Sequence, residues 1–264
     1  MALRLSVLDQ SPISEGMTGS QALRNTIDLA QLTDALGYHR YWVAEHHGGP
    51  MLAGPSPEAL IGPIASATER IRVGSGGVML PHYSPFKVAE TFSVLAGLYP
   101  GRIDLGLGRA AGTDPMTTHA LQRDRSKAMP DDFPQQLAEL LAYYEGKIPI
   151  SSPLARLAKV LPGRPETPEP WLLGSSPQSA VWAGELGLPY AFADFINANG
   201  AESAAISAPP GLMKSANAYG SPSSPAQIAL CGEEPSSHGS GASGTPGSAV
   251  RRLSGWSSGK RSSR

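Results

Sequence analysis

Tyr41-Trp42-Val43-Ala44-Glu45-His46-His47 is a short apolar run that ends in three polar side chains. Its aromatic and β-branched residues favour a buried strand. An amphipathic helix is expected before it, over residues 20–36, because apolar side chains recur there at helical spacing. A second helix is expected after it, over residues 57–68, with a proline at its start. The run is therefore one strand in an alternating series.

The same alternation extends outward in both directions as far as about Gly200. The expected strands cover residues 3–8, 41–44, 71–75, 102–107, 170–173 and 189–195. The expected helices cover residues 20–36, 57–68, 85–98, 132–144 and 178–186. Repeated strand-helix units predict a parallel sheet with right-handed crossovers.

Two closures of such a sheet are open at this point, a doubly wound sheet and a (β/α)8 barrel. Several expected strands end in polar or glycine-rich clusters, namely Glu45-His46-His47, Gly76-Gly77, Gly108-Arg109 and Ser175-Ser176. A barrel builds its active site from the carboxyl ends of many strands, whereas an open sheet concentrates its ligand contacts at one switch point. The sequence favours the barrel.

The composition changes after about Gly200. From Ser203 to Arg264, 31 of 62 residues are serine, glycine or proline, and no apolar periodicity remains. Such a segment cannot bury enough apolar surface to offset its ordering entropy. We therefore predict a barrel domain over residues 1–200 and a disordered, low-complexity tail over residues 201–264. Because that tail offers no strand, the fold class is an α/β, TIM (β/α)8-type barrel that is incomplete, with about six strands.

Composition excludes several classes of protein. The chain has 264 residues and a formal net charge of −1, which gives no electrostatic reason to expect nucleic acid or an anionic membrane as a partner. Cys231 is the single cysteine, so neither an internal disulfide nor a cysteine metal cluster can form. Asp9 and Gln10 come too early for a signal-peptide core, and no apolar run approaches the roughly 20 residues that span a bilayer. We expect a reduced, soluble, cytoplasmic protein.

Two adjacent histidines and a carboxylate at the end of a strand indicate a functional site. Successive side chains of a strand point to opposite faces, so we expect only one of His46 and His47 to face the barrel mouth. Zinc is an alternative occupant, but it needs a third protein ligand from elsewhere, and no HExxH spacing is present. No metal ligand is assigned.

Residues 106–112, Gly-Leu-Gly-Arg-Ala-Ala-Gly, resemble a dinucleotide-binding glycine loop. A Rossmann loop opens a helix at once, whereas Thr113-Asp114-Pro115 follows here. The better interpretation is a close approach of the backbone to a ligand, with Arg109 directed at an anion.

Gly174-Ser175-Ser176-Pro177-Gln178-Ser179 joins an expected strand to the next helix. Hydroxyls and backbone amides at a helix N-terminus can bind a phosphate. Simple helix capping by Ser175 or Ser176 explains the same residues equally well. Because Arg109 ends the preceding strand, a shared anion pocket is the more attractive interpretation.

Taken together, the motifs resemble those of luciferase-like flavin monooxygenases. The similar stretches are residues 43–47, 73–81, 101–109, 171–176 and 185–189, in the same order and at similar spacing. The resemblance covers residues 3–199. It implies a TIM barrel that takes reduced FMN as a cosubstrate, together with O2.

The resemblance also implies roles for individual residues. His46 corresponds to the family's catalytic histidine beside the flavin ring, and Gly76-Gly77 to a non-prolyl cis peptide against that ring. Gly108 lines the flavin site at the position where luciferases proper have a reactive cysteine, so light emission is not implied. The phosphate-binding positions correspond to Arg109, Ser176 and Ser179, although the family's acid is replaced by Ser175.

The implied reaction is oxygenation of a small organic substrate such as an aldehyde, with a flavin reductase supplying FMNH2 and a homodimer as the assembly. The alternatives are an F420-dependent hydride-transfer enzyme on the same barrel, a catalytically silent flavin-binding protein, and a truncated product without activity. The tail has the composition expected when a GC-rich gene is read in the wrong frame. We therefore expect a frameshift near codon 200, unpaired strand edges and an impaired product.

Overall fold

Strands and helices alternate along the chain from β1 to β6, as the sequence predicts. The computed structural model describes residues 4–109, 114–122, 124–126, 132–159, 161, 167–197, 213–217 and 229–233. Strands β1 to β6 span Arg4–Asp9, Arg40–Val43, Arg72–Met79, Ile103–Gly108, Glu169–Gly174 and Tyr190–Ala193. The α-helices α1 to α6 span Gly19–Ala35, Pro57–Ala67, Pro85–Leu98, Pro115–Leu121, Phe133–Glu145 and Pro177–Leu186. The 3-10 helices η1 and η2 span Leu80–His82 and Pro153–Lys159.

Local sequence signals set the helix boundaries. Thr18 and Gln21 form a capping box at the start of α1, in which each side chain accepts a backbone N–H of the other residue. Proline opens α2, α3 and α6, where its missing N–H costs nothing. Gly146 and Gly187 end α5 and α6 in the left-handed conformation that glycine adopts without strain.

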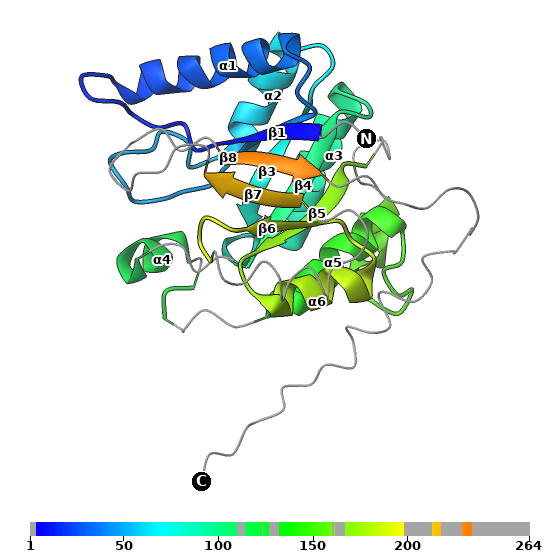
Figure 1. The fold of residues 1–264 in the computed structure, drawn as a ribbon. Helices are drawn as coiled ribbons and strands as arrows, with labels where there is room; N and C mark the ends of the chain where they lie inside the picture. Colours follow the sequence, from blue (N-terminus) through cyan, green and yellow to red (C-terminus); the bar gives the residue numbers. More distant parts are fainter. Residues whose placement is uncertain are drawn as a thin grey trace.

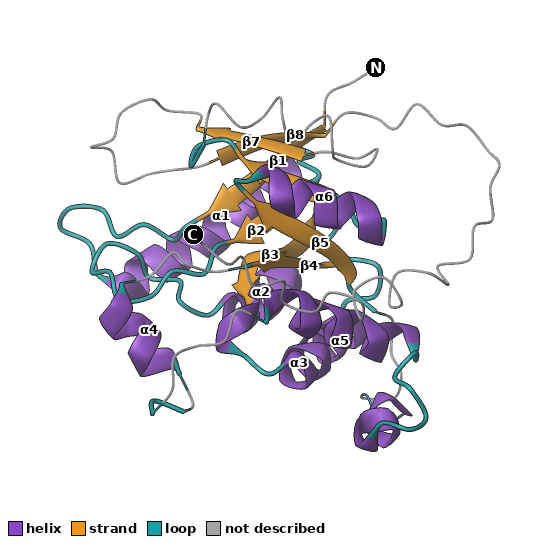
Figure 2. Ribbon diagram, turned by 90° about the horizontal axis from the view of Figure 1, so that it is seen from below, coloured by secondary structure: helices purple, strands orange, loops and turns teal. Residues whose placement is uncertain are grey.

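The six strands β1 to β6 are parallel, each paired with the next, which confirms the predicted α/β barrel. Two further strands, β7 (Met213–Asn217) and β8 (Ala229–Glu233), complete a ring of eight. Strand β7 runs parallel to β6, whereas β8 runs antiparallel to both β7 and β1. Figure 1 shows β7 and β8 beside β1, and Figure 2 shows the same three strands from below.

The prediction that the segment after Gly200 supplies no strand, and leaves strand edges unpaired, is therefore wrong. Strand pairing uses backbone N–H and C=O groups, which every non-proline residue carries, so a segment can pair without a strong side-chain pattern. The open edges of β6 and β1 find such partners in β7 and β8. The remainder of the predicted tail lies outside the described residues.

Two apolar clusters occupy the two sides of the strands. The outer cluster lies between the strands and helices α2, α3, α5 and α6, and it includes Tyr41, Val73, Leu105 and Phe192. The inner cluster lies within the ring and comprises Leu8, Trp42, Ala44, Trp171 and Ala191. The rings of Trp42 and Trp171 meet edge to face, with their centroids 5.3 Å apart.

An ionic network lies on the amino-terminal side of these tryptophans. The Asp104 carboxylate is fully buried and accepts bonds from Arg40 Nη1 at 2.6 Å, Arg72 Nη2 at 2.5 Å and Trp42 Nε1 at 2.9 Å. Arg72 also pairs with Glu169 at 2.9 Å. Since buried charges are retained only when paired and hydrogen-bonded, this network fixes the amino-terminal layer of the barrel.

Candidate active site

The carboxyl ends of β1 to β6 meet at one end of the ring. The paired positions there include Asp9 with Val43, Met79 with Gly108, and Gly174 with Phe192. Each of the predicted site residues lies in or directly after one of these strand ends, as follows: His46 after β2, Gly76 and Gly77 in β3, Gly108 and Arg109 at the end of β4, and Ser176 and Ser179 after β5. The structure thus brings all seven to the same end of the barrel.

Side-chain alternation along β2 separates the two histidines. Trp42 and Ala44 belong to the inner cluster, whereas Tyr41 and Val43 belong to the outer one. If the alternation is extended past Ala44, His46 is expected on the inner side. His47 falls on the outer side together with Glu45.

The contacts of Glu45 and His47 agree with this assignment. Glu45 is buried, and its Oε1 lies 2.7 Å from His47 Nε2. The same carboxylate accepts the Tyr83 hydroxyl at 2.8 Å and the Met79 backbone N–H at 2.9 Å. Because Met79 ends β3 and Tyr83 follows it, Glu45 and His47 join two neighbouring strand ends.

His46 is half-buried, and within the described part of the chain its ring makes no hydrogen bond to another residue. Burial lowers the pKa of His46 below its ordinary value of 6.5, nearby His47 lowers it further, and the charge of Glu45 raises it in part. The lowered pKa favours the neutral imidazole at pH 7. A neutral ring can accept a proton from a bound reactant.

Glycine is required at the bulge in β3. The Gly76–Gly77 peptide bond is cis, the geometry that the resemblance implies at this position. The pairing register with β4 shifts between Ser75 and Val78, on either side of this bond. A Cβ on Gly77 would lie 2.7 Å from the Gly106 carbonyl oxygen, and one on Gly76 would overlap the Leu8 side chain. Only glycine allows β3 to approach its neighbours so closely.

Gly108 differs from Gly76 and Gly77, because a side chain at this position would not clash with its neighbours. A Cβ built on it would meet no atom of the described residues closer than the Val78 carbonyl oxygen, at 3.9 Å. Packing within the described part of the chain therefore does not demand glycine at this position. The missing side chain leaves space beside the end of β4, next to the exposed Arg109.

The two predicted serines differ in what their hydroxyl groups can do. Ser176 is exposed and is the N-cap residue of α6, but its side chain makes no capping hydrogen bond, so the capping interpretation does not hold for it. Ser179 is buried, and its hydroxyl donates to the Ser176 carbonyl at 2.8 Å and lies 2.8 Å from the Tyr190 hydroxyl. The exposed Ser176 hydroxyl lies 3.3 Å from the Ser179 hydroxyl, and Ser179 in turn joins α6 to β6 through Tyr190.

Sequence reasoning missed Tyr83 and the role of Glu45. Glu45 was noticed as part of the cluster with the histidines, but its partners lie 34 and 38 positions further along the chain. The only signal in the sequence is a carboxylate directly after an apolar strand, which is costly to bury without donors.

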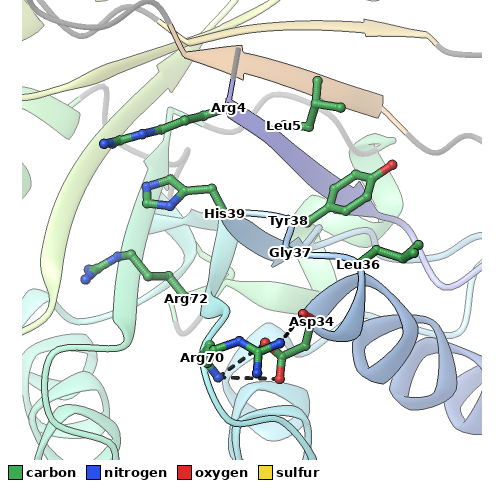
Figure 3. A pocket seen from close by; sticks show the side chains of 9 residues that line it. All are labelled: Arg4, Leu5, Asp34, Leu36, Gly37, Tyr38, His39, Arg70 and Arg72. Carbon is green, nitrogen blue, oxygen red and sulfur yellow. Dashed lines mark hydrogen bonds between the residues drawn. The ribbon is translucent and has the colours of Figure 1, made fainter. Parts of the chain in front are cut away.

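A pocket of about 600 Å³ lies at the opposite end of the barrel, at the amino ends of the strands. Figure 3 shows that the side chains of Arg4, His39 and Arg72 point in the same direction there. Asp34, on the same wall, accepts the backbone N–H groups of Glu69, Arg70 and Ile71. Asp34 and Arg72 thus already serve contacts that join α1 to the start of β3 and β3 to β4.

A family model of luciferase-like monooxygenases matches residues 3–225. The chain belongs to the luciferase-like monooxygenase family. YwcH of Bacillus subtilis strain 168 is 54% identical over 198 residues, which are 75% of this chain and 59% of YwcH. The N-acetyl-S-alkylcysteine monooxygenase of the same organism is 46% identical over 195 residues, which are 74% of this chain and 58% of that protein. This luciferase-like chain thus spans less than two thirds of the length of these relatives.

Solved structures agree with the family. The crystal structure of apo-MsnO8 matches with a TM-score of 0.70 and 46% identity, covering 78% of this chain and 60% of that one. The FMN complex of the oxygenating constituent of 3,6-diketocamphane monooxygenase from Pseudomonas putida has a TM-score of 0.58 and 23% identity, covering 73% and 57%. An F420-dependent secondary alcohol dehydrogenase has a TM-score of 0.51 and 17% identity, covering 80% and 66%. Because these last two structures are less than 25% identical to this chain, their likeness concerns the fold alone.

Among the described residues, no three or more histidine, cysteine, aspartate or glutamate side chains gather in a way that could hold a metal ion. No described helix of this luciferase-like chain is both long and apolar enough to span a membrane.

Proposed function

We propose that this chain carries the flavin site of a monooxygenase that uses reduced FMN and O2 to oxygenate a small organic substrate. The observation that supports this function is the gathering of four kinds of group on consecutive strand ends. They are the neutral imidazole of His46, the glycine bulge of β3, the open position at Gly108, and the anion-binding groups of Arg109 and Ser176. Residues 1–200, which carry strands β1 to β6, would hold this site.

The residues present fit a flavin. The space left by Gly108 can receive a flat ring beside the backbone of β4, and the neighbouring bulge at Gly76-Gly77 supplies a second backbone wall. Arg109 follows β4 and Ser176 follows β5, and these strands are neighbours, so the two can bind one phosphate group. Reduced flavin supplies the activation of O2, which no protein side chain provides.

The protein's own groups have three tasks in this proposal. Arg109 and Ser176 bind the phosphate and thereby orient the cofactor. His46, neutral at pH 7, accepts a proton from the reacting group and can return it. The walls of the site exclude water from the reaction.

The substrate and the assembly belong to the same proposal. An aldehyde is one substrate class to test, and the relative that acts on N-acetyl-S-alkylcysteine adds S-alkyl thioethers as a second class. We expect a separate flavin reductase to supply FMNH2 in the cytoplasm, and a homodimer as the working assembly.

The test is an anaerobic titration of the purified protein with reduced FMN, with parallel titrations of reduced F420 and NADPH. We expect saturable binding of reduced FMN, followed by substrate-dependent oxygen consumption once air is admitted. Tight binding of F420 without FMN binding would favour hydride transfer on the same barrel. FMN binding without oxygen uptake beyond free-flavin autoxidation would identify a silent flavin-binding protein, and NADPH binding alone would refute the assignment.

Replacing Arg109 with alanine is expected to weaken the binding of reduced FMN by about 1.5–3 kcal/mol, the typical contribution of a hydrogen bond to a charged group. The reason is the loss of a guanidinium beside the proposed phosphate site. The matched control is Arg24→Ala, which removes an exposed arginine from the outer helix α1 and should leave the dissociation constant unchanged. Equal effects of the two substitutions on FMN binding would contradict the proposed phosphate contact.

A further inference from the structure

The buried Glu45 carboxylate links the loop that carries His46 to the strand that carries the glycine bulge. We infer that Glu45 is a positioning residue, which holds His46 at a fixed distance from the Gly76-Gly77 wall through its bonds to His47, Met79 and Tyr83. The inference rests on the proposed function, because it assigns to Glu45 a part in the chemistry of His46.

The geometry of Glu45 is that of an anchor between two strand ends. Its side chain is fully buried and accepts three donors at 2.7 to 2.9 Å: His47 from its own loop, Met79 at the end of β3, and Tyr83 after β3. Carboxylates with several short, charge-assisted bonds are held in a single orientation. The position of Glu45 is thereby set by β3 as much as by β2.

His46 lies directly beside this anchor and has no comparable anchor of its own. Its ring makes no hydrogen bond to another described residue. The chain that follows contains Gly48, which is exposed and has a φ of +74°. The anchored residues Glu45 and His47 on either side therefore determine where the His46 ring lies relative to the bulge.

The same carboxylate acts on His46 electrostatically. Its charge raises the pKa of His46, against burial and the neighbouring His47, which both lower it. Glu58 from α2 and His82 and Tyr83 from the segment after β3 also interact with Glu45. Among these groups, Glu45 is the one whose charge raises the pKa of His46. Removing that charge should therefore lower this pKa.

The experiment compares Glu45→Gln with the unaltered full chain. The amide keeps the size of the side chain, but it loses the charge, and its nitrogen cannot accept the Met79 N–H. The primary measurement is an NMR titration of the histidine ring nitrogens in ¹⁵N-histidine-labelled protein, with the His46 signal assigned through His46→Ala. It needs no flavin, so it gives a result even if the proposed cofactor does not bind.

We expect Glu45→Gln to shift the His46 ring signals and to lower the pKa of His46 further. At saturating reduced FMN, we expect kcat to fall by about 10- to 100-fold, the scale of a small misplacement of a reacting group, while the dissociation constant of FMN changes by less than about threefold. The matched control is Glu58→Gln, which makes the same carboxyl-to-amide change nearby, at a residue outside the Glu45 hydrogen bonds. It should leave the His46 titration unchanged.

A purely structural role of Glu45 predicts different results. Unaltered His46 signals and an unaltered pKa in Glu45→Gln, with only a lower melting temperature, would overturn the inference. If Glu45→Gln does not fold, Glu45→Asp takes its place. It keeps the charge but shortens the side chain by one methylene, so we expect displaced His46 signals and reduced kcat, and unchanged signals would again overturn the inference. Failure of the unaltered chain to bind FMN, together with shifted His46 signals, would refute the proposed function and leave the positioning role supported.

Discussion

Asp104→Asn is expected to lower the free energy of unfolding by about 3–5 kcal/mol, the usual cost of removing one partner from a buried ion pair. Asp104 is fully buried and neutralises Arg40 and Arg72, which approach it at 2.6 and 2.5 Å. An asparagine keeps the shape but leaves two guanidinium groups without their shared counter-charge. Glu169 compensates only in part: it lies 2.9 Å from Arg72 and 3.5 Å from Arg40, but its side chain is partly exposed, so its charge is screened by solvent.

Urea unfolding monitored by circular dichroism measures this loss. The control is Asp28→Asn on the exposed face of α1, which should change the free energy of unfolding by no more than about 0.5 kcal/mol. A loss below about 1 kcal/mol for Asp104→Asn would mean that the network contributes little to stability. Trp42, whose Nε1 donates to Asp104 at 2.9 Å, offers a second signal through its fluorescence.

The order of strands and helices could be predicted from the sequence, because alternation of apolar patterns is a local property. The parallel barrel followed from that alternation together with the polar clusters at the strand ends. The partners of Asp104 could not be predicted, since Arg40 and Arg72 lie 64 and 32 positions earlier in the chain. A charged residue inside an apolar strand implies that partners exist, but not which residues they are.

Strands β7 and β8 show a second limit of sequence patterns. Their pairing with β6 and β1 depends on the backbone groups exposed at two strand edges, and not on a hydrophobic period in residues 213–217 or 229–233. These two strands therefore could not be predicted from a composition rich in serine, glycine and proline.

The candidate site was predictable in its location more than in its hydrogen bonds. Strand alternation required His46 and His47 to face different sides, and the inner position of Trp42 and Ala44 then assigned the sides. For Ser179, the spacing predicted a place in the first turn of α6. The Tyr190 hydroxyl that engages it comes from the next strand and could not be foreseen.

His46→Ala is expected to lower kcat by about 10²- to 10⁴-fold at saturating reduced FMN, the contribution typical of a general acid or base. The fold should remain intact, because the His46 ring makes no hydrogen bond within the described residues. In the unaltered protein, the pKa of His46 lies below 6.5, so turnover that depends on the neutral ring should be retained above that pH. It should be lost as the pH falls through the lowered pKa.

His47→Ala provides the comparison, because the two histidines are adjacent in sequence but differ in their contacts. His47 pairs with the buried Glu45 carboxylate at 2.7 Å, so its removal should destabilise the protein by about 1–3 kcal/mol, the cost of a buried acceptor that loses a donor. Its effect on kcat should be smaller than that of His46→Ala. Thermal unfolding and steady-state turnover of the two variants, measured side by side, should therefore rank them in opposite order. Equal losses of turnover in the two variants, or full turnover in His46→Ala, would show that His46 is not the general base of the site.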